Sequence, residues 1–257
     1  MIRIRECAGR SEERFFAQKL REYFERDLFP DPKDEDRAYF LGREYFEQLE
    51  KLHARPDDRL RMLLFSRDGE DIGFVMATIY NTEDDKCFLM EFCVFPEYRG
   101  GGTGRACAKL FFDWAYGQGA EYIELNAHTE QRVRFWKSLG FVENGRDDWG
   151  DPMYMLPPEK KLPFAVKKLE QFDDWQLCKL VNGLLCEKGG EPLSDEQRDK
   201  MAQMLVERKY TVHAAMRGFR MVGICFVRGR RGRIEDVYVE PVFRGQGIEE
   251  LLQGACQ

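Results

Sequence analysis

The stretch Leu89–Gly104, Leu-Met-Glu-Phe-Cys-Val-Phe-Pro-Glu-Tyr-Arg-Gly-Gly-Gly-Thr-Gly, contains the pattern that decides the fold. An apolar strand is predicted to run into Pro96. A loop then begins at Arg99 and carries four glycines before a helix starts. Because glycine has no Cβ, the backbone N–H groups of consecutive glycines can approach a ligand closely. Together with the N-terminus of the helix, these groups form an anion site suited to a pyrophosphate.

A second, imperfect copy of this stretch occurs at Ile234–Gly247, Ile-Glu-Asp-Val-Tyr-Val-Glu-Pro-Val-Phe-Arg-Gly-Gln-Gly. Two other phosphate loops are excluded. A P-loop requires lysine directly after its second glycine, whereas Arg105 follows Gly104. A dinucleotide fingerprint beginning at Gly102 would need glycine or alanine where the chain has Cys107. The remaining pattern is Arg-x-x-Gly-x-Gly directly after a strand that ends Val-x-Pro.

That pattern resembles the GNAT superfamily of acyl-CoA-dependent N-acyltransferases, in which this loop and the following helix hold the pyrophosphate of coenzyme A. The stretch Phe135–Phe141, Phe-Trp-Lys-Ser-Leu-Gly-Phe, is similar to a second landmark of the family. The resemblance covers Met1–Pro157 as a whole domain and Phe164–Gln257 as a partial one. It implies the α+β class: a mixed, mostly antiparallel central sheet flanked by helices, followed by a truncated second copy of the same fold.

The domain organisation follows from the predicted element order, β-α-α-β-β-β-α-β-α-β-β, which restarts after a proline-rich segment. We expect a complete domain over residues 1–157, a linker over 158–163 and a partial, degenerate domain over 164–257. In the first domain, helical stripes are predicted over Ser11–Phe29 and Tyr39–Leu52. The partial domain lacks every element after its loop helix, and we expect its open sheet edge to be buried against the first domain.

Charge is unevenly distributed along the chain. Residues 1–162 carry 25 Lys and Arg against 32 Asp and Glu, a net charge of −7. Acidic surroundings favour a cationic amine as substrate, although a solvated surface would give the same composition. The basic cluster Arg228–Arg233 is short and lacks aromatic residues, so it predicts a hairpin turn and no nucleic-acid partner.

The cysteine, histidine and apolar residues indicate in which compartment the protein occurs and whether it binds a metal or crosses a membrane. Eight cysteines occur without a Cys-x-x-Cys pair, which predicts reduced thiols in a cytoplasmic protein. The three histidines stand apart from any cysteine pair, so no metal is expected. No apolar run approaches the roughly 20 residues of a membrane span, and the N-terminus predicts a strand rather than a signal peptide. The oligomeric state, including a homodimer, stays open.

The resemblance assigns a set of residues to acetyl-CoA. Its pyrophosphate is expected on the loop amides of Arg99, Gly100, Gly101, Gly102, Thr103 and Gly104. Its pantetheine arm is expected to pair with the main chain of Phe92, Cys93 and Val94, where one amide would also stabilise the oxyanion. Phe135 and Trp136 would pack along the same arm, while Asn126 would either hydrogen-bond pantetheine or act as a cap.

Glu91 and Tyr154 are the catalytic candidates. Many family members have an acid at the position of Glu91 that deprotonates the amine. The alternatives are a solvated or salt-bridged strand carboxylate and a site with no dedicated base, in which an acidic pocket selects an amine that is already neutral. The chain departs from the family at Trp136, where many members have a tyrosine that protonates the departing sulfur. Indole cannot supply that proton. Either Tyr154 or a water molecule supplies it instead, or the reaction needs no acid.

These residues predict an acetyl-CoA-dependent N-acetyltransferase that transfers an acetyl group to a primary amine of a small, cationic molecule. The alternative is a non-catalytic acyl-CoA-binding or regulatory module, and transfer of a longer acyl chain stays open. The second copy is expected to be non-catalytic, because Glu249 replaces the last glycine of its loop and would repel a pyrophosphate.

Overall fold

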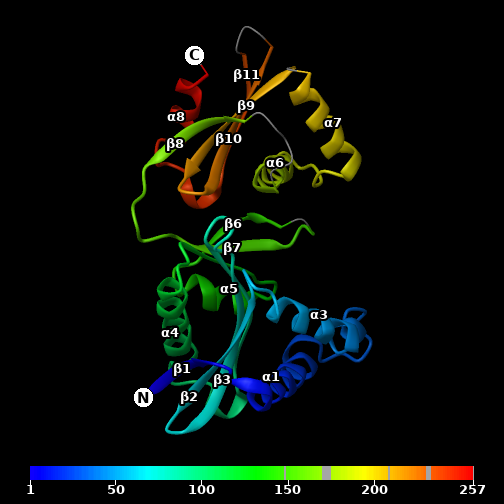
Figure 1. Ribbon diagram of the computed structural model, residues 1–257, viewed down its shortest axis with the longest axis vertical. Helices are drawn as coiled ribbons and strands as arrows, with labels where there is room; N and C mark the ends of the chain where they lie inside the picture. Colours follow the sequence, from blue (N-terminus) through cyan, green and yellow to red (C-terminus); the bar gives the residue numbers. More distant parts are fainter. Residues whose placement is uncertain (148, 170–174, 208, 230–232, 257) are drawn as a thin grey trace. The chain divides into compact units, whose positions relative to one another are not determined.

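A computed structural model of the chain describes residues 1–147, 149–169, 175–207, 209–229 and 233–256 (Figure 1). The chain divides into two compact units, Met1–Ile123 and Glu124–Gln257. Its strands form a seven-stranded sheet in the order β1-β2-β3-β4-β5-β7-β6 and a four-stranded sheet in the order β11-β10-β9-β8. The pairs β1–β2, β2–β3, β3–β4 and β6–β7 are antiparallel, as are all three pairs of the smaller sheet. The predicted α+β class is confirmed.

The first unit contains the strands β1–β4 and a layer of helices on each face of them. Helices cover both faces of β1–β4, with α1 and α3 on one face and α4 on the other (Figure 1). Its elements are β1 (Ile2–Glu6), α1 (Gly9–Tyr23), η1 (Phe24–Leu28), α2 (Arg37–Phe40), α3 (Arg43–His53), β2 (Leu60–Arg67), β3 (Glu70–Ile79), β4 (Lys86–Val94), η2 (Pro96–Tyr98) and α4 (Thr103–Gly117).

The helical pair differs from the predicted pattern in two places. The stripe over Ser11–Phe29 forms an α-helix only as far as Tyr23, and the chain continues as the π-helix η1. The second stripe is divided between α2 and α3, because Gly42 is the N-cap of a new helix. Apolar spacing predicts a helix but does not distinguish α from π hydrogen bonding. The same spacing also continues across Gly42, so neither change was predicted from the sequence.

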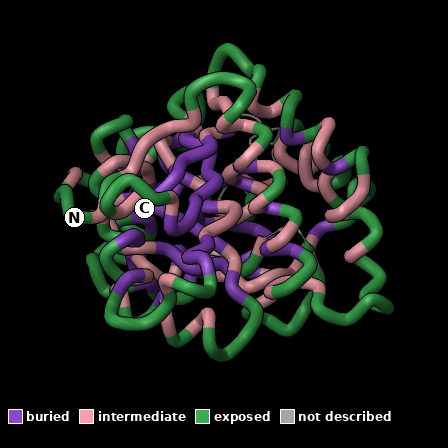
Figure 2. Tube along the Cα trace, turned by 90° about the horizontal axis from the view of Figure 1, so that it is seen from below, coloured by how far each residue is buried: buried purple, intermediate pink, exposed green. Residues whose placement is uncertain are grey.

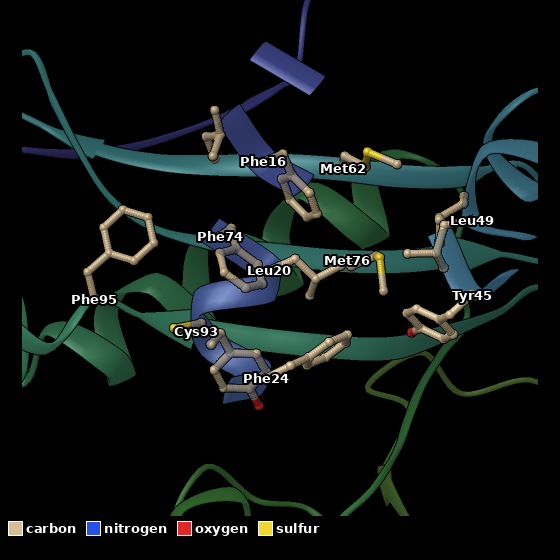
Figure 3. Packing of buried hydrophobic residues seen from close by; sticks show 13 residues of the cluster. Phe16, Leu20, Phe24, Tyr45, Leu49, Met62, Phe74, Met76, Cys93 and Phe95 are labelled. Atoms are coloured by element: carbon tan, nitrogen blue, oxygen red, sulfur yellow. The ribbon is translucent and has the colours of Figure 1, made fainter. Parts of the chain in front are cut away.

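An apolar cluster joins α1, η1 and α3 to the facing side of the sheet. Figure 3 shows Phe16, Leu20 and Phe24 packing against Phe74 and other buried side chains of β2–β4. Buried residues, in purple, lie in the interior of the trace, while exposed residues, in green, gather in the outer loops (Figure 2). This packing fixes one face of β4, the strand that leads into the glycine loop.

The second unit begins within β5 (Tyr122–Asn126) and continues through α5 (Glu130–Lys137), β6 (Val142–Arg146) and β7 (Pro152–Leu156). Thr129 caps α5, because its hydroxyl accepts a hydrogen bond from the amide of Arg132 at 3.3 Å. The predicted strand Tyr122–Asn126 has the observed bounds, and the helix and the closing strand pair differ from prediction by only a few residues.

The same unit then repeats the element order of the first. It contains β8 (Phe164–Leu169), α6 (Trp175–Glu187), α7 (Asp195–Val206), β9 (Tyr210–Arg217), β10 (Arg220–Arg228), β11 (Arg233–Val239), η3 (Pro241–Phe243) and α8 (Ile248–Gly254). Neighbouring strands β8-β9-β10-β11 correspond to β1-β2-β3-β4. The predicted capping box of Ser194 and Gln197 is confirmed. Within the predicted turn Arg228–Arg233, residues 230–232 lie outside the described part of the chain.

The repeated elements contact β6 through η3 and α6. The amide of Asn144 donates to Glu240 at 3.4 Å, and the backbone N–H of Val242 donates to the Asn144 carbonyl oxygen at 3.2 Å. Because β6 and β11 belong to different sheets, these contacts are made by side chains and a loop rather than by strand pairing.

Candidate active site

The loop between β4 and α4 has three consecutive residues in the left-handed region of backbone space. The φ angles are 92° at Gly100, 55° at Gly101 and 82° at Gly102, which is also the N-cap of α4. A Cβ added at any of these positions would meet no atom within 4 Å. Glycine is therefore required by the backbone conformation rather than by close packing, and the loop is open on its outer side.

The loop amides are available to a ligand. The amide of Thr103 donates to the Gly100 carbonyl at 3.0 Å, and that of Ala106 donates to Gly102 at 3.0 Å. Among the backbone hydrogen bonds of the described residues, none is donated by Gly101, Gly102 or Gly104. The first turn of α4 contains no acidic residue. Free N–H groups in a left-handed turn at a helix N-terminus form a binding site for an anion.

Arg99 fixes this loop through its side chain. Its Nε donates to the carbonyl of Val94 at 2.8 Å, and its guanidinium pairs with Asp27 of the π-helix η1. Burial alone would raise the pKa of Asp27, but the hydrogen bonds from Arg26 and Arg99 outweigh burial and hold that pKa below its ordinary value. The backbone N–H of Arg99 donates to Pro96 at 3.2 Å. Arg99 therefore joins the loop to β4 and to η1.

The three residues predicted to pair with pantetheine differ in the direction of their backbone groups. The amide of Phe95 donates to Ile72 of β3 at 2.9 Å. Because backbone groups alternate along a strand, those of Cys93 also face β3, whereas those of Phe92 and Val94 point to the opposite edge. Burial raises the pKa of the Cys93 thiol to about 11. The main-chain groups of Phe92 and Val94 thus face the side of β4 on which β5 is the neighbouring strand.

Glu91 follows a β-bulge that the sequence did not reveal. In the β3–β4 register, Glu91 lies opposite Met76 and Leu89 lies opposite Ala77, so Met90 is the extra residue. Paired residues share a face, and Met76 belongs to the cluster under α1 and α3 (Figure 3). Burial and then the charge of Glu91 raise the pKa of Tyr45. The Glu91 carboxylate therefore lies near Tyr45, between β4 and the helical pair.

The other predicted residues lie in the second unit and are described within it. The Asn126 side-chain amide donates to Asp147 at 3.0 Å and to the Pro152 carbonyl at 3.3 Å, which leaves its oxygen as the acceptor for a further partner. Trp136 is 6% exposed and packs edge-on against Phe141, with ring centroids 5.3 Å apart. Its neighbour Phe135 is half-buried.

Tyr154 lies in β7 opposite Glu143 and is 5% exposed. Burial raises its pKa, so the phenol is the protonated form at neutral pH. Its assignment as the general acid stays a prediction.

We call the elements from β8 to α8, residues 164–254, the repeat. An arginine holds its loop in the same way as Arg99 holds the first loop, but the helix that follows begins with acidic residues. The Nε of Arg244 donates to the carbonyl of Val239 at 2.9 Å, and its guanidinium pairs with Glu187. Gly247 is the left-handed N-cap of α8, with φ of 80°. Glu249 and Glu250 occupy the first turn of that helix. Two carboxylates at a helix N-terminus oppose the binding of a phosphate group.

No metal site or membrane-spanning segment is found in the described part of the chain. Among these residues, no group of three or more His, Cys, Asp and Glu side chains is arranged to hold a metal ion. None of the described helices has the length and apolar character needed to cross a bilayer.

A part of the chain that includes this strand, loop and helix matches the model of a protein family. Residues 17–141 match the model of the acetyltransferase (GNAT) family. The matched segment contains β4, the glycine loop, α4 and the Leu-Gly-Phe landmark that ends at Phe141. Over this segment, the chain is similar to the acetyltransferase (GNAT) family. A search of curated protein sequences finds no significant match.

Several solved structures are similar to the chain. A PaiA N-acetyltransferase from Thermoplasma acidophilum in complex with coenzyme A has 18% identity and a TM-score of 0.47, over 60% of this chain and 98% of that one. A GNAT acetyltransferase from Staphylococcus aureus has 18% identity and a TM-score of 0.44, over 60% and 98%. A tandem GNAT protein from the clavulanic acid biosynthesis pathway has 13% identity and a TM-score of 0.43, over 99% and 84%.

Proposed function

We propose that the chain transfers an acetyl group from acetyl-CoA to a primary amine of a small, cationic molecule. The observation that carries this proposal is the run of three left-handed glycines before α4. The amides of Gly101 and Gly102, the helix N-terminus and the absence of acidic residues in its first turn suit the pyrophosphate of coenzyme A. A membrane-anchored or nucleic-acid role has no support in the residues of this loop.

The strand before the loop supports the remaining requirements of the reaction. The main chain of Phe92 and Val94 points away from β3, so it can pair with the pantetheine amides as an added strand would. The Val94 carbonyl is taken by Arg99, which leaves the Val94 amide as a donor for the thioester oxygen. Such a donor is most effective if it meets the negative charge that develops in the tetrahedral intermediate.

Glu91 supplies the base in this proposal. A carboxylate between β4 and the helical pair can accept the proton of an ammonium ion, and the neutral amine then attacks the thioester carbon. The N–C bond forms, the C–S bond breaks and coenzyme A departs as the thiol. Tyr154, with its phenol protonated, is the candidate for the proton that the sulfur gains. The net charge of −7 over residues 1–162 supports a cationic substrate.

A thiol-release assay tests the proposal. The full chain is incubated with acetyl-CoA and a panel of polyamines, lysine-like amines and neutral alcohols, and free thiol is measured against time. We expect release that depends on a cationic amine, with the acetylated amine identified by mass spectrometry. Binding of acetyl-CoA without release on any amine would instead support the non-catalytic acyl-CoA-binding or regulatory module.

A further inference from the structure

The repeat contains a cavity that the acetyl-transfer proposal does not use. It has a volume of about 220 Å³ and lies between α6, α7 and strands β9–β11. Its walls are largely apolar, with two carboxylates at one side; they are formed by Val181, Leu184, Leu185, Leu193, Met201, Met204, Leu205, Tyr210, Phe226, Glu235 and Asp236. An engineered apolar cavity of about 150 Å³ is large enough to bind benzene.

One of the two carboxylates, Asp236, occupies the position in the repeat that Glu91 occupies in the first copy, and Glu235 corresponds to Met90. In the β10–β11 register, Asp236 lies opposite Phe226 and Ile234 lies opposite Val227, so Glu235 is the extra residue of a bulge. This is the geometry of the bulge before Glu91. The repeat has therefore kept a carboxylate after a bulge on the strand that precedes its loop, although the loop itself has become acidic.

Helix α7 covers this cavity without closing it. None of its residues is buried, although Met201 and Leu205 pack against the core of the repeat. By contrast, α6 buries Leu177, Leu180 and Val181 against the same core. These half-exposed apolar side chains still contact water. A ligand that fills the cavity would bury them, and burial of apolar surface favours binding.

Both carboxylates are paired with exposed cations. Asp236 pairs with Lys188, whose side chain is 52% exposed, and Glu235 pairs with Arg228 at 3.2 Å, whose side chain is 65% exposed. Ion pairs between exposed side chains contribute little to stability, so a ligand ammonium group can replace Lys188 beside Asp236 at little cost. Glu235 also accepts a hydrogen bond from Tyr210. Asp236 is thus the carboxylate free to exchange its partner.

We propose that the repeat binds a small amphipathic ammonium ion, with an apolar group of the size of one aromatic ring in the cavity and the charged nitrogen beside Asp236. It binds this ligand without acylating it, because Glu249 and Glu250 oppose a pyrophosphate at the adjoining loop. The inference rests on the cavity and its acid and is independent of acetyl transfer by the first copy.

Methionine-methyl NMR of the full chain, without acetyl-CoA, tests this site with benzylamine as the probe. Met201 and Met204 line the cavity, whereas Met62 and Met76 lie in the core of the first unit and are internal controls. We expect saturable shifts of the Met201 and Met204 signals with benzylamine. Benzyl alcohol, of the same shape, and methylamine, without the ring, should bind at least tenfold more weakly.

Substitutions test separately the contribution of the Asp236 charge and that of the cavity volume to benzylamine binding. Asp236→Asn should weaken benzylamine binding about tenfold, while Asp195→Asn, which changes a fully exposed acid on α7, should leave it unchanged. Met201→Trp fills the cavity and should abolish binding, with Met204→Phe as a second filling variant if the first does not fold. The proposal is overturned if benzylamine shifts neither cavity methionine, or if the filled variant and Asp236→Asn bind it as the natural chain does.

Discussion

The guanidinium of Arg220, in β10, donates a hydrogen bond of 2.5 Å to the carboxylate of Glu124, in β5, although 96 positions separate the two residues. Both side chains are 2% exposed. Glu240 accepts two further hydrogen bonds from Arg220, and Lys179 lies 3.2 Å from Glu124 and 3.4 Å from Glu240. Among the described residues, these two cations and two anions form a network, buried except for the partly exposed Lys179, that joins β5 to the repeat.

Removal of Arg220 should destabilise the chain strongly. In Arg220→Ala the carboxylates of Glu124 and Glu240 stay buried and lose the guanidinium that bridges them. Breaking one side of a buried ion pair costs about 3–5 kcal/mol in free energy of unfolding. Urea denaturation followed by circular dichroism measures the loss. The control Arg228→Ala removes a pair whose arginine is 65% exposed and should change that free energy by less than about 1 kcal/mol.

Stability at acid pH should depend on Asp27. Its pKa in the folded chain lies below the ordinary value of 3.8, so the pair with Arg99 is fully formed above about pH 4 and is lost as the pH falls through the folded-state pKa. Asp27→Asn should lower the free energy of unfolding at pH 6 and flatten its decline below pH 4. A decline as steep as that of the natural chain would show that another carboxylate governs this range.

Glu91→Gln tests the assignment of the base. We expect turnover with acetyl-CoA and a primary amine to fall by about 10²-fold at pH 7, because general-base catalysis contributes on the order of 10²–10⁴. The deficit should shrink at pH 9, where more of the amine is already neutral. Glu97→Gln, an exposed acid beyond the same strand, is the matched control and should retain activity. An equal deficit at both pH values would remove Glu91 from this role.

Buried thiols should react slowly with a disulfide reagent. Burial raises the pKa of Cys93 and Cys107 to about 11 and that of Cys7 and Cys225 to about 12, so little thiolate is present at pH 8. Timed labelling followed by mass spectrometry should find these four unmodified in the native chain and all eight cysteines modified in denaturant. Fast native labelling of Cys107 would contradict the packing of α4 described here.

The sequence predicted the elements well where local pattern determines them. The strands Tyr122–Asn126 and Arg233–Val239 have the predicted bounds, and the triple glycine correctly predicted a loop between β4 and α4. Glycine runs and apolar alternation are local signals, since backbone conformation and burial of neighbouring residues produce them directly.

Features that depend on distant contacts were missed. The pair of Arg99 with Asp27 requires a π-helix whose hydrogen bonding leaves no mark on apolar spacing. The bulge at Met90 depends on the register with β3, and the buried pair of Arg220 with Glu124 depends on how the repeat meets β5. A single charged residue has no periodicity, so its partner cannot be inferred from one sequence.

Calorimetric titration of coenzyme A into two matched variants tests the central claim most directly. Gly102 and Gly247 have φ angles of 82° and 80°, each is the N-cap of a helix, and a Cβ added at either would meet no atom within 4 Å. Glutamate therefore adds the same strain and charge at both. We predict that Gly102→Glu weakens coenzyme A binding by at least about 100-fold and that Gly247→Glu binds as the natural chain does. Unchanged affinity in Gly102→Glu, or an equal loss in both variants, would contradict the assignment of the coenzyme to the first loop.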